Sequence, residues 1–173
     1  MSVVSSVVLE ISALFSATTI QLNLRCSKRE DILRELVENI PAIARSPDTK
    51  DQLHRALLAR EGLCSTGLGR GIAIPHTRNT IAAAAGRTLI VFGRHPTGVE
   101  YGAADQMPIR LFFLLLAPDI HRHLHTLSRL TRILRGAEVR EQLLSASSPQ
   151  EVIAAIRMAE TRSQAAVATT NGH

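Results

Sequence analysis

The sequence predicts a single α/β domain in which helices cover a mixed β-sheet. Apolar segments of strand length alternate along the chain with segments whose apolar residues recur at helical spacing. The chain has 173 residues, 45% of them hydrophobic and 20% charged, which suits one domain with its own core. We place the domain at residues 1–158. Residues 159–173 are polar and rich in Ala and Thr without periodicity, and we predict a disordered tail there.

Four segments have the pattern of strands. Residues 19–24 alternate apolar and polar side chains, which predicts a half-buried strand near an edge of the sheet. Residues 72–74 form a short apolar strand, and residues 87–93 form a buried one. Residues 109–116 are a long apolar run, so we place this strand at the centre of the sheet, after a turn-rich loop at residues 96–104.

The helices are predicted from their start signals and apolar faces. Ser27 and Glu30 have the spacing of a capping box and open a helix that Pro41 ends. Asp48 can cap a second helix, and Ser148 can cap the last one, with Pro at its first position. Further helices are expected at residues 10–15, 121–134 and 138–146.

A glycine-rich stretch leads to a histidine near the middle of the chain. Glycines alternate over residues 67–71, and Pro75 stops the strand that follows, so His76 should lie at a strand exit. We interpret the glycines as a loop whose backbone amides could bind phosphate. The spacing matches neither a Walker P-loop nor the dinucleotide fingerprint. A tight turn beside an incidental surface histidine is the alternative interpretation.

A second histidine is predicted to point into the fold. The apolar residues of the helix after Pro118 define one face, and His123 falls near its middle, whereas His121 and His125 project to the far side. This divergence argues against a metal site, and we expect no metal or cofactor. The apolar face consists of Leu124, Leu127, Leu130, Ile133 and Leu134.

His76 and His123 both follow strand exits, so adjacent strands would bring the two imidazoles into one cleft. A neutral imidazole is a competent nucleophile, and a second imidazole or an arginine beside it could stabilise the charge of a transferring phosphoryl group. The alternative is that His123 is a half-buried histidine whose role is structural. Ser65 and Thr66 have no convincing acid partner in the sequence, which leaves Ser-His-Asp hydrolysis a weak third interpretation.

Composition excludes several other classes. The net charge of +5 is spread over several elements without a basic run, so we expect no nucleic-acid partner. Cys26 and Cys64 do not make a disulfide framework, which indicates a reducing compartment. The start of the chain lacks a basic n-region, and no run of about 18 uncharged apolar residues occurs. We therefore expect a cytoplasmic protein without direct membrane insertion.

The quoted motifs resemble a known family. The stretch from residue 60 to residue 76 reads REGLCSTGLGRGIAIPH and closely resembles the signature of the enzyme IIA domains of the fructose/mannitol type in the bacterial phosphoenolpyruvate-dependent phosphotransferase system. Two further stretches agree in order and spacing, VEYGAADQMPIRLFFLLLAP from residue 99 and HLHTLS from residue 123. The resemblance covers residues 5–158, and the last motif is most similar to the nitrogen-regulatory branch.

The resemblance implies a phosphocarrier with a mixed sheet sandwiched between helices. In this family the histidine that matches His76 accepts a phosphoryl group on Nε2 from the phosphohistidine of an HPr-type carrier protein. His123 matches the second active-site histidine, and Arg60 matches the cation on the phosphate side. The phosphate-lining and loop residues expected at the site are Ser65, Thr66, Gly67 and Gly69.

The expected role is regulatory, because the chain carries no membrane segment and no attached transporter domain. The downstream partner would then be a regulated kinase or channel protein. A IIA component of a fructose/mannitol-type transporter, which passes the group to a IIB component, is the alternative, as is a IIA-like binding module without catalysis. The sequence departs from the family at Thr77, Arg78, Arg94 and Cys64. The two arginines would make the rim of the site more cationic.

Overall fold

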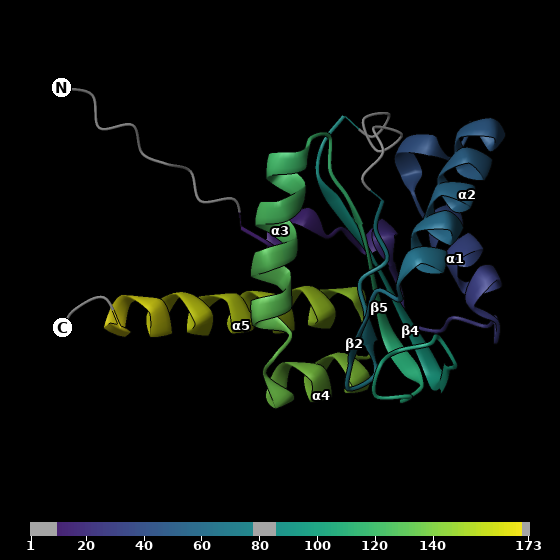
Figure 1. Ribbon diagram of the computed structural model, residues 1–173. Helices are drawn as coiled ribbons and strands as arrows, with labels where there is room; N and C mark the ends of the chain where they lie inside the picture. Colours follow the sequence, from purple (N-terminus) through teal and green to yellow (C-terminus); the bar gives the residue numbers. More distant parts are fainter. Residues whose placement is uncertain (1–9, 78–85, 171–173) are drawn as a thin grey trace, which may run out of the picture.

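A five-stranded mixed sheet lies between two layers of helices in the computed structural model, which describes residues 10–77 and 86–170 (Figure 1). The strand order is β1-β4-β5-β3-β2. The pairs β1–β4 and β3–β5 are parallel, and β4–β5 and β2–β3 are antiparallel. The strands are β1 Ile20–Gln21, β2 Gly67–Gly69, β3 Ile72–Ala73, β4 Leu89–Val99 and β5 Ile109–Leu116.

Two helices cover one face of the sheet and three cover the other (Figure 1). The first layer contains α1 Arg29–Glu38 and α2 Pro47–Leu63. The second contains α3 Ile120–Ile133, α4 Ala137–Ser145 and α5 Pro149–Thr170. Short 3-10 turns are η1 Ser12–Leu14, η2 Ala17–Thr19 and η3 Pro41–Ile43. This arrangement confirms the predicted single α/β domain with a mixed sheet.

Strand β5 is central, as its apolar sequence predicted. Its side chains alternate between the two cores, because neighbouring residues in a strand point to opposite faces. Phe112 packs in the core under α1 and α2, and Phe113 packs in the core under the other three helices. Phe113 meets Phe92 edge to face, with ring centroids 5.2 Å apart. A strand that is buried on both faces therefore reads as a continuous apolar run.

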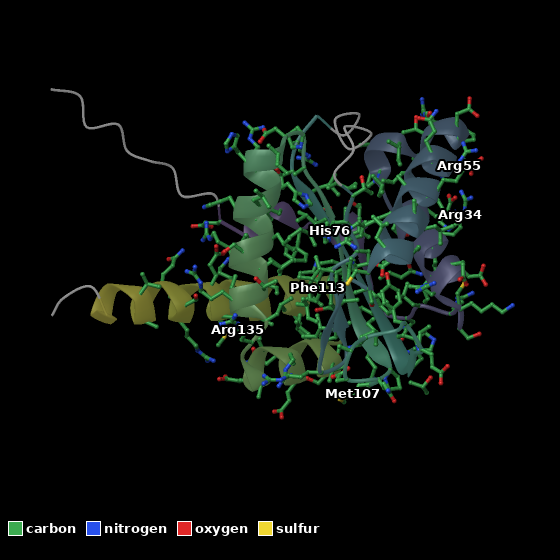
Figure 2. The ribbon with its side chains drawn as sticks, in the orientation of Figure 1. Arg34, Arg55, His76, Met107, Phe113 and Arg135 are labelled. Carbon is green, nitrogen blue, oxygen red and sulfur yellow. The ribbon has the colours of Figure 1, made fainter. Side chains whose placement is uncertain are left out.

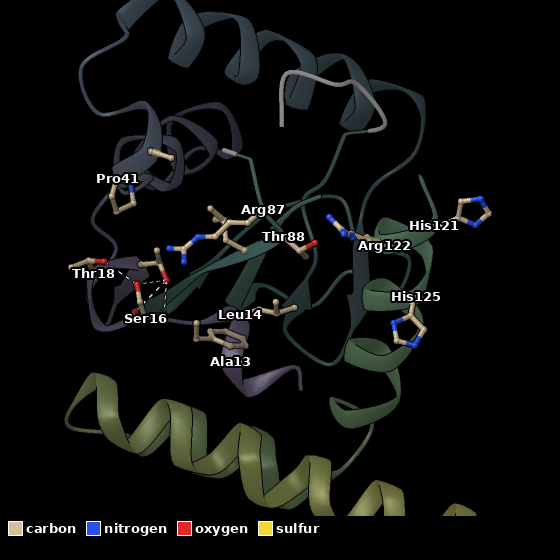
Figure 3. A pocket seen from close by; sticks show the side chains of 14 residues that line it. Ala13, Leu14, Ser16, Thr18, Pro41, Arg87, Thr88, His121, Arg122 and His125 are labelled. Carbon is tan, nitrogen blue, oxygen red and sulfur yellow. Dashed lines mark hydrogen bonds between the residues drawn. The ribbon is translucent and has the colours of Figure 1, made fainter. Parts of the chain in front are cut away.

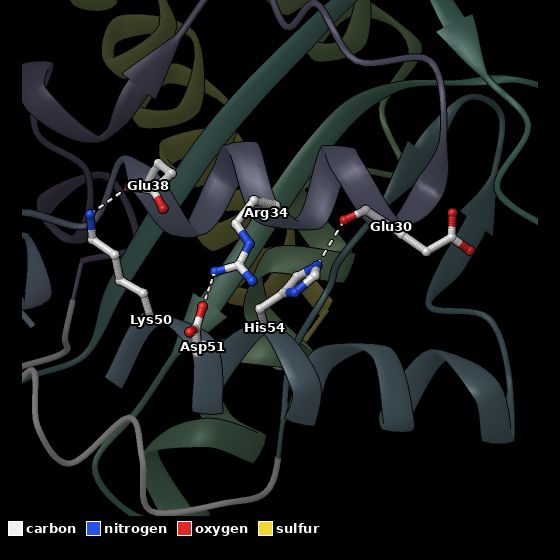
Figure 4. Close-up of polar contacts among 6 residues, drawn as sticks. All are labelled: Glu30, Arg34, Glu38, Lys50, Asp51 and His54. Carbon is white, nitrogen blue, oxygen red and sulfur yellow. Dashed lines mark hydrogen bonds and ion pairs between the residues drawn. The ribbon is translucent and has the colours of Figure 1, made fainter. Parts of the chain in front are cut away.

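The layer of α1 and α2 is held by its apolar faces and by polar pairs at its surface. The apolar face of α1 is fully buried: Ile32, Leu33, Leu36 and Val37 are 0% exposed, as is Ile40 just after the helix. Outside it, Arg34 Nη1 lies 2.6 Å from Asp51 Oδ1, and His54 Nε2 donates to the Glu30 carbonyl oxygen at 2.8 Å (Figure 4). Exposed pairs of this kind contribute little to folding, so burial of the apolar face dominates the stability of the layer.

The start of α1 differs from the predicted capping box. The helix begins at Arg29, its N-cap is Lys28, and no side chain caps it. The segment before the helix is held instead by Glu35, whose carboxylate accepts the N–H groups of Arg25 and Cys26 at 3.1–3.2 Å. The Glu35 carboxylate thus holds the segment that precedes the helix, and it does not take over the capping role expected of Ser27.

The start of α2 also differs, because Ser46 is its N-cap and Asp48 lies in its first turn. Strand β4 continues to Val99, with a break in its register after Arg94, where a loop from residue 96 was expected. The cap of α5 agrees with the prediction, since the Glu151 N–H donates to Ser148 Oγ at 3.2 Å. Local hydrogen-bonding signals therefore located these helices to within a residue or two.

The C-terminal region differs from the predicted disordered tail, because α5 continues to Thr170. Glu160 gives a physical reason: its carboxylate is buried and accepts the N–H groups of Ile11 at 2.7 Å and Ser12 at 3.2 Å. Alanine-rich sequence also favours helix once its first turns are anchored. The domain boundary at residue 158 stays a prediction. None of the helices in the described ranges is both long and apolar enough to span a bilayer.

Candidate active site

His76 lies where the line of β3 ends. Pro75 interrupts the strand, but its carbonyl accepts the Leu115 N–H at 2.9 Å, and His76 forms an isolated parallel bridge with Leu115. The residue therefore lies at the end of the sheet where β5 finishes, opposite the end that Met107 marks (Figure 2). The exit from a strand beside a central strand is where α/β folds commonly place a functional side chain.

The His76 ring is fixed by its own backbone. Its Nδ1 lies 2.7 Å from the carbonyl oxygen of Ile74, and the residue is 9% exposed. A carbonyl oxygen can only accept, so Nδ1 carries the proton and donates it. In the neutral imidazole the lone pair is then on Nε2, which is the nitrogen that a nucleophilic role requires.

His123 meets His76 from the first turns of α3. The two ring centroids are 5.0 Å apart with the planes tilted by 54°. Asp119 caps the helix by accepting the Arg122 N–H at 2.8 Å, which sets where the helix begins and hence the direction of His123. The ring is 5% exposed, as its place on the apolar face predicted. The helix N-terminus carries partial positive charge close to the histidine pair, which favours an anion there.

The other histidines of α3 do not join the pair. His121 and His125 are exposed, as predicted from their positions on the far side of the helix. In the part of the chain that the structure describes, no group of three His, Cys, Asp or Glu side chains could hold a metal ion. Leu124 is an error in the predicted apolar face: it is 56% exposed, because the buried face of α3 runs through His123, Thr126 and Leu130 and leaves Leu124 on its flank.

The loop after α2 runs beside the exit of β3. The Ile74 N–H donates to the Thr66 carbonyl at 3.1 Å, which extends the β2–β3 pairing toward His76. Arg60, in the last turn of α2, donates from Nη1 to the carbonyl of Cys64 at 2.7 Å. The structure thus brings Arg60 to the loop that adjoins the histidine. Ser65 Oγ accepts the Gly67 N–H at 3.1 Å and so shapes the same loop.

A buried carboxylate supports this loop from behind. Glu61 is 3% exposed and accepts the Thr66 N–H at 3.0 Å, the Thr66 hydroxyl, and the Tyr101 hydroxyl at 2.9 Å. Burial and the nearby charge of Glu61 raise the pKa of Tyr101 far above its ordinary range. The Thr66 hydroxyl therefore points to Glu61, and this differs from the expectation that it lines the phosphate site.

The sequence interpretation did not single out Glu61, although a signal for it exists. Leu53 and Leu57 are the buried residues of α2, and Glu61 follows them at the same four-residue interval. Residues four apart share one face of a helix. A glutamate in register with a buried stripe needs hydrogen-bond donors inside the fold, and such a position could have been flagged from spacing alone.

The glycines form a hairpin and not the expected loop. Gly67 and Gly69 belong to β2, and the turn is made by Arg70 and Gly71 with positive φ angles of 55° and 76°. Glycine is required at residue 67 because an added Cβ would lie 2.7 Å from the Cβ of Ala103. The glycines allow the backbone to pack closely and to turn with positive φ angles, and their main role is to form this hairpin.

The hairpin also separates Gly69 from the histidines. Gly69 pairs with Ile72, which pairs with Leu111, whereas His76 pairs with Leu115. Four residues of strand correspond to about 13 Å. The structure therefore places Gly69 toward the far end of the sheet, and its expected contact with phosphate is not supported by this geometry.

Arg94 does not add to the rim of the site. Its guanidinium donates to the Leu22 carbonyl at 3.0 Å and to three carbonyls at the end of α4, those of Leu143, Leu144 and Ala146, at 2.8–3.2 Å. It therefore joins β4 to the helix layer at a distance from His76. The expectation for Arg78 falls outside the described residues.

These features define an α/β domain that holds two histidines between a strand exit and the first turns of a helix. The sequence profile of the family described as "Phosphoenolpyruvate-dependent sugar phosphotransferase system, EIIA 2" matches residues 13–159. The chain belongs to this family, whose members are phosphotransfer components.

Relatives with different roles resemble the chain. The "PTS system fructose-specific EIIABC component" of Bacillus subtilis is 35% identical over 84% of this chain, which spans only 22% of that protein. The "PTS system fructose-specific EIIA component" of Haloferax volcanii is 40% identical over 61% of this chain and 68% of its own. The "Nitrogen regulatory protein" of Escherichia coli is 30% identical over 83% of this chain and 87% of its own.

Solved structures agree with the fold. The nitrogen regulatory protein IIA-Ntr of Neisseria meningitidis superposes with a TM-score of 0.75 at 30% identity, covering 84% of this chain and 98% of that one. The IIA mannitol protein of E. coli superposes with a TM-score of 0.68 at 27% identity, covering 82% and 98%. A complex of the latter type with phosphorylated enzyme IIB, at 26% identity, has a TM-score of 0.66 and coverage of 82% and 96%.

Proposed function

We propose that this protein is a phosphocarrier that accepts a phosphoryl group on Nε2 of His76 from the phosphohistidine of an HPr-type protein. The observation that carries the proposal is the hydrogen bond from His76 Nδ1 to the Ile74 carbonyl at 2.7 Å, with the His123 ring 5.0 Å away. The bond fixes the tautomer in which Nε2 is the nucleophile. Family membership supplies the chemical context.

The transfer exchanges one phosphorus–nitrogen bond for another. The Nε2 lone pair of His76 forms a bond to phosphorus while the bond to the donor's imidazole nitrogen breaks, and its electron pair goes to that nitrogen. The Nδ1 proton stays in place, and the Ile74 carbonyl stabilises the positive charge that the ring gains. Catalysis then depends on positioning and on stabilising the charge of the equatorial oxygens.

Two side chains can stabilise the negative charge on the oxygens of the transferring phosphoryl group. The His123 ring can donate a hydrogen bond to a phosphoryl oxygen, and it is held at the positive end of α3. Arg60 donates to the Cys64 carbonyl, in the loop that follows α2 and whose Thr66 carbonyl accepts the Ile74 N–H. A guanidinium binds phosphate oxygens with well-defined geometry. We therefore propose that Arg60 also stabilises the charge of these oxygens, with a smaller effect than His123.

The donor would dock on exposed apolar side chains near the histidines. Leu63 is 84% exposed at the end of α2, and Ile120 and Leu124 are 49% and 56% exposed in the first turns of α3. Large apolar residues that stay exposed on a folded domain favour a protein partner. The related mannitol IIA protein forms a complex with phosphorylated IIB, so an acceptor of the same kind could use this surface.

We assign the chain a nitrogen-regulatory role, supported by its motif HLHTLS and by relatives named "Nitrogen regulatory protein" that it covers almost entirely. A IIA component of a fructose-type transporter is the second candidate, favoured by the 40% identity to the Haloferax relative. The two roles differ in the acceptor. Rapid transfer from the phosphorylated chain to a fructose-type IIB domain would favour transport, and its absence would favour regulation.

The phosphocarrier proposal is tested by incubating the chain with phosphoenolpyruvate, enzyme I and several HPr-type carriers. We expect an acid-labile adduct of one phosphoryl group by intact-mass spectrometry, lost in His76→Ala and kept in the matched control His121→Ala, which changes an exposed histidine of α3. No adduct with any carrier would refute the proposal. An adduct that persists in His76→Ala would refute the assignment of the acceptor.

The assignments of His123 and Arg60 are tested in the same assay. We expect His123→Ala to fold and to slow phosphorylation by about 100-fold, as is usual when one charge-stabilising group is removed. Arg60→Gln should slow it by a smaller factor. Unchanged kinetics in a folded His123→Ala would leave this histidine with a structural role only.

A further inference from the structure

A groove of about 1100 Å³ lies on the other flank of α3, and neither His76 nor His123 lines it (Figure 3). It is bounded by residues 13–19, by the start of β4 and by the first two turns of α3. Part of its wall is apolar, from Leu14, Phe15, Pro41 and Leu89. A groove of this size with an apolar wall and a few polar groups has the character of a site for a small molecule.

Half of the polar side chains that line the groove are basic, and the other half carry neutral hydroxyls. Its basic residues are Arg87, Arg122, His121 and His125, and no aspartate or glutamate of the described ranges lines it. Arg122 pairs with Asp119, whose carboxylate lies 3.5 Å from Arg122 Nε in an exposed pair. An exposed pair of this kind is weak, so Arg122 can exchange it for a ligand at little cost. The charge of the groove therefore selects an anion.

One buried polar atom points to a ligand independently of charge. Thr88 lines the groove and is 9% exposed, and its buried Oγ1 has no hydrogen-bond partner among the residues that the structure describes. A buried hydroxyl without a partner costs free energy, and such groups are uncommon in folded proteins. Figure 3 draws this hydroxyl toward the side of the groove where Arg122 lies. The Arg122 side chain is 60% exposed and can move to admit a group that both residues contact.

We propose that this groove binds a small organic anion, with a carboxylate or phosphate between Thr88 and Arg122 and an apolar body against Leu14 and Phe15. The Thr88 hydroxyl donates to the anion and gains the partner that it lacks within the fold. Arg122 supplies the charge. The site is separate from the phosphoryl acceptor and does not depend on it, although both sites share the first turns of α3.

The proposal is tested by NMR titration of the full chain, labelled with ¹⁵N, with four probes: benzoate, phenyl phosphate, inorganic phosphate and the neutral benzyl alcohol. We expect saturable shifts at the amides of Thr88, Leu89 and Arg122 with benzoate or phenyl phosphate. Whichever of the two binds more tightly identifies the anionic group. Benzyl alcohol and inorganic phosphate should each bind at least about tenfold more weakly, because each lacks one half of the recognition.

Substitutions then locate the site. Thr88→Val keeps the shape of the side chain and removes the hydroxyl, and Arg122→Gln removes the charge. Each should weaken binding about tenfold, the usual scale for one hydrogen bond to a charged group. Arg132→Gln, an exposed arginine of the same helix outside the groove, is the matched control and should change nothing. Circular dichroism checks that each variant folds.

The same NMR titration is repeated in His76→Ala. This distinguishes binding in the groove from binding of phosphate at the histidine pair. Shifts that persist in that variant support the proposal. Three results would overturn it: no saturable shift with any probe up to about 10 mM, binding that Thr88→Val and Arg122→Gln leave unchanged, or shifts that map to His76 and vanish in His76→Ala.

Discussion

Two buried glutamates hold opposite parts of this molecule, and they do so by different means. Glu61 and Glu160 are almost equally buried, at 3% and 4% exposed. Glu160 accepts two backbone N–H groups and forms an ion pair of 2.5 Å with Arg129, whose side chain is 14% exposed. Glu61 accepts one backbone N–H and two hydroxyls, and within the described ranges it forms no ion pair.

The difference separates a structural clamp from a support of the site. A buried ion pair is strongly destabilised when one partner is removed, because the remaining charge stays buried. A carboxylate among hydroxyls is more tolerant, because a hydroxyl can either donate or accept. We therefore expect loss of charge to cost more at Glu160, in the segment that joins the ends of the domain, than at Glu61 beside the site loop.

The largest expected effect is that of Glu160→Gln. The substitution removes the charge that Arg129 pairs with and should lower the free energy of unfolding by about 3 kcal/mol. Urea denaturation followed by circular dichroism measures it. Glu138→Gln, which breaks the exposed pair with Arg162, is the control and should cost less than about 0.5 kcal/mol. An equal loss of unfolding free energy in the two variants would show that burial of Glu160 does not strengthen its ion pair.

Glu61→Gln should have an intermediate effect, a loss of about 1.5 kcal/mol. Its carbonyl oxygen can still accept the Thr66 N–H, while the Thr66 and Tyr101 hydroxyls reverse and accept from the new amide. The same urea titration measures the loss, and the phosphorylation rate of the folded variant should stay within about threefold of wild type. A loss as large as that of Glu160→Gln would contradict the comparison.

Tyr101→Phe should cost less, about 1 kcal/mol, because it removes one hydrogen bond to Glu61 and keeps the ring against Phe112 at 5.4 Å. It should also change the pH dependence. Burial raises the pKa of Tyr101 above its ordinary value of 10.0, so this residue stabilises the fold below pH 10 and the contribution falls as the pH rises above it. Unfolding measured from pH 8 to 11 should show that the variant lacks this decline.

The smallest expected effect concerns the surface of the α1–α2 layer. The hydrogen bond and the charge of Arg34 lower the pKa of Asp51 below its ordinary value of 3.8. A lowered pKa means that the pair stabilises the fold above pH 3.8 and that the contribution is lost as the pH falls through the folded pKa.

Arg34→Gln should therefore return the pKa of Asp51 toward 3.8, measured by NMR titration of its carboxyl carbon. Salt should have the same effect in the wild-type chain, because the pair is exposed and screening reaches it. A pKa that ignores both changes would show that the contact drawn in Figure 4 does not persist in solution.

Periodicity predicted much of the fold and the direction of one site residue. The helical spacing of the residues after His123 indicated that this ring points inward, and it is buried against His76. The apolar run at residues 109–116 indicated the central strand. Both inferences depend on burial alone, and buried faces produce a periodic pattern of apolar residues in the sequence.

What sequence could not predict depends on pairing between distant residues. Gly69 was expected at the phosphate site because a run of glycines can direct backbone amides at an anion, but a hairpin places it toward the other end of the sheet. Residues 159–170 have no apolar repeat, and their helix is anchored by contacts of Glu160 with Ile11 and Ser12. Separations of almost 150 residues along the chain leave no local pattern.

The contact between Ile11 and Glu160 places the entry and the exit of the domain next to each other, so both flanking segments can leave from one location. Adjacent termini allow a domain to be inserted into a longer polypeptide without distortion. The relative from Bacillus subtilis carries the corresponding region as 22% of its length, and this geometry makes such fusions compatible with an unchanged histidine pair.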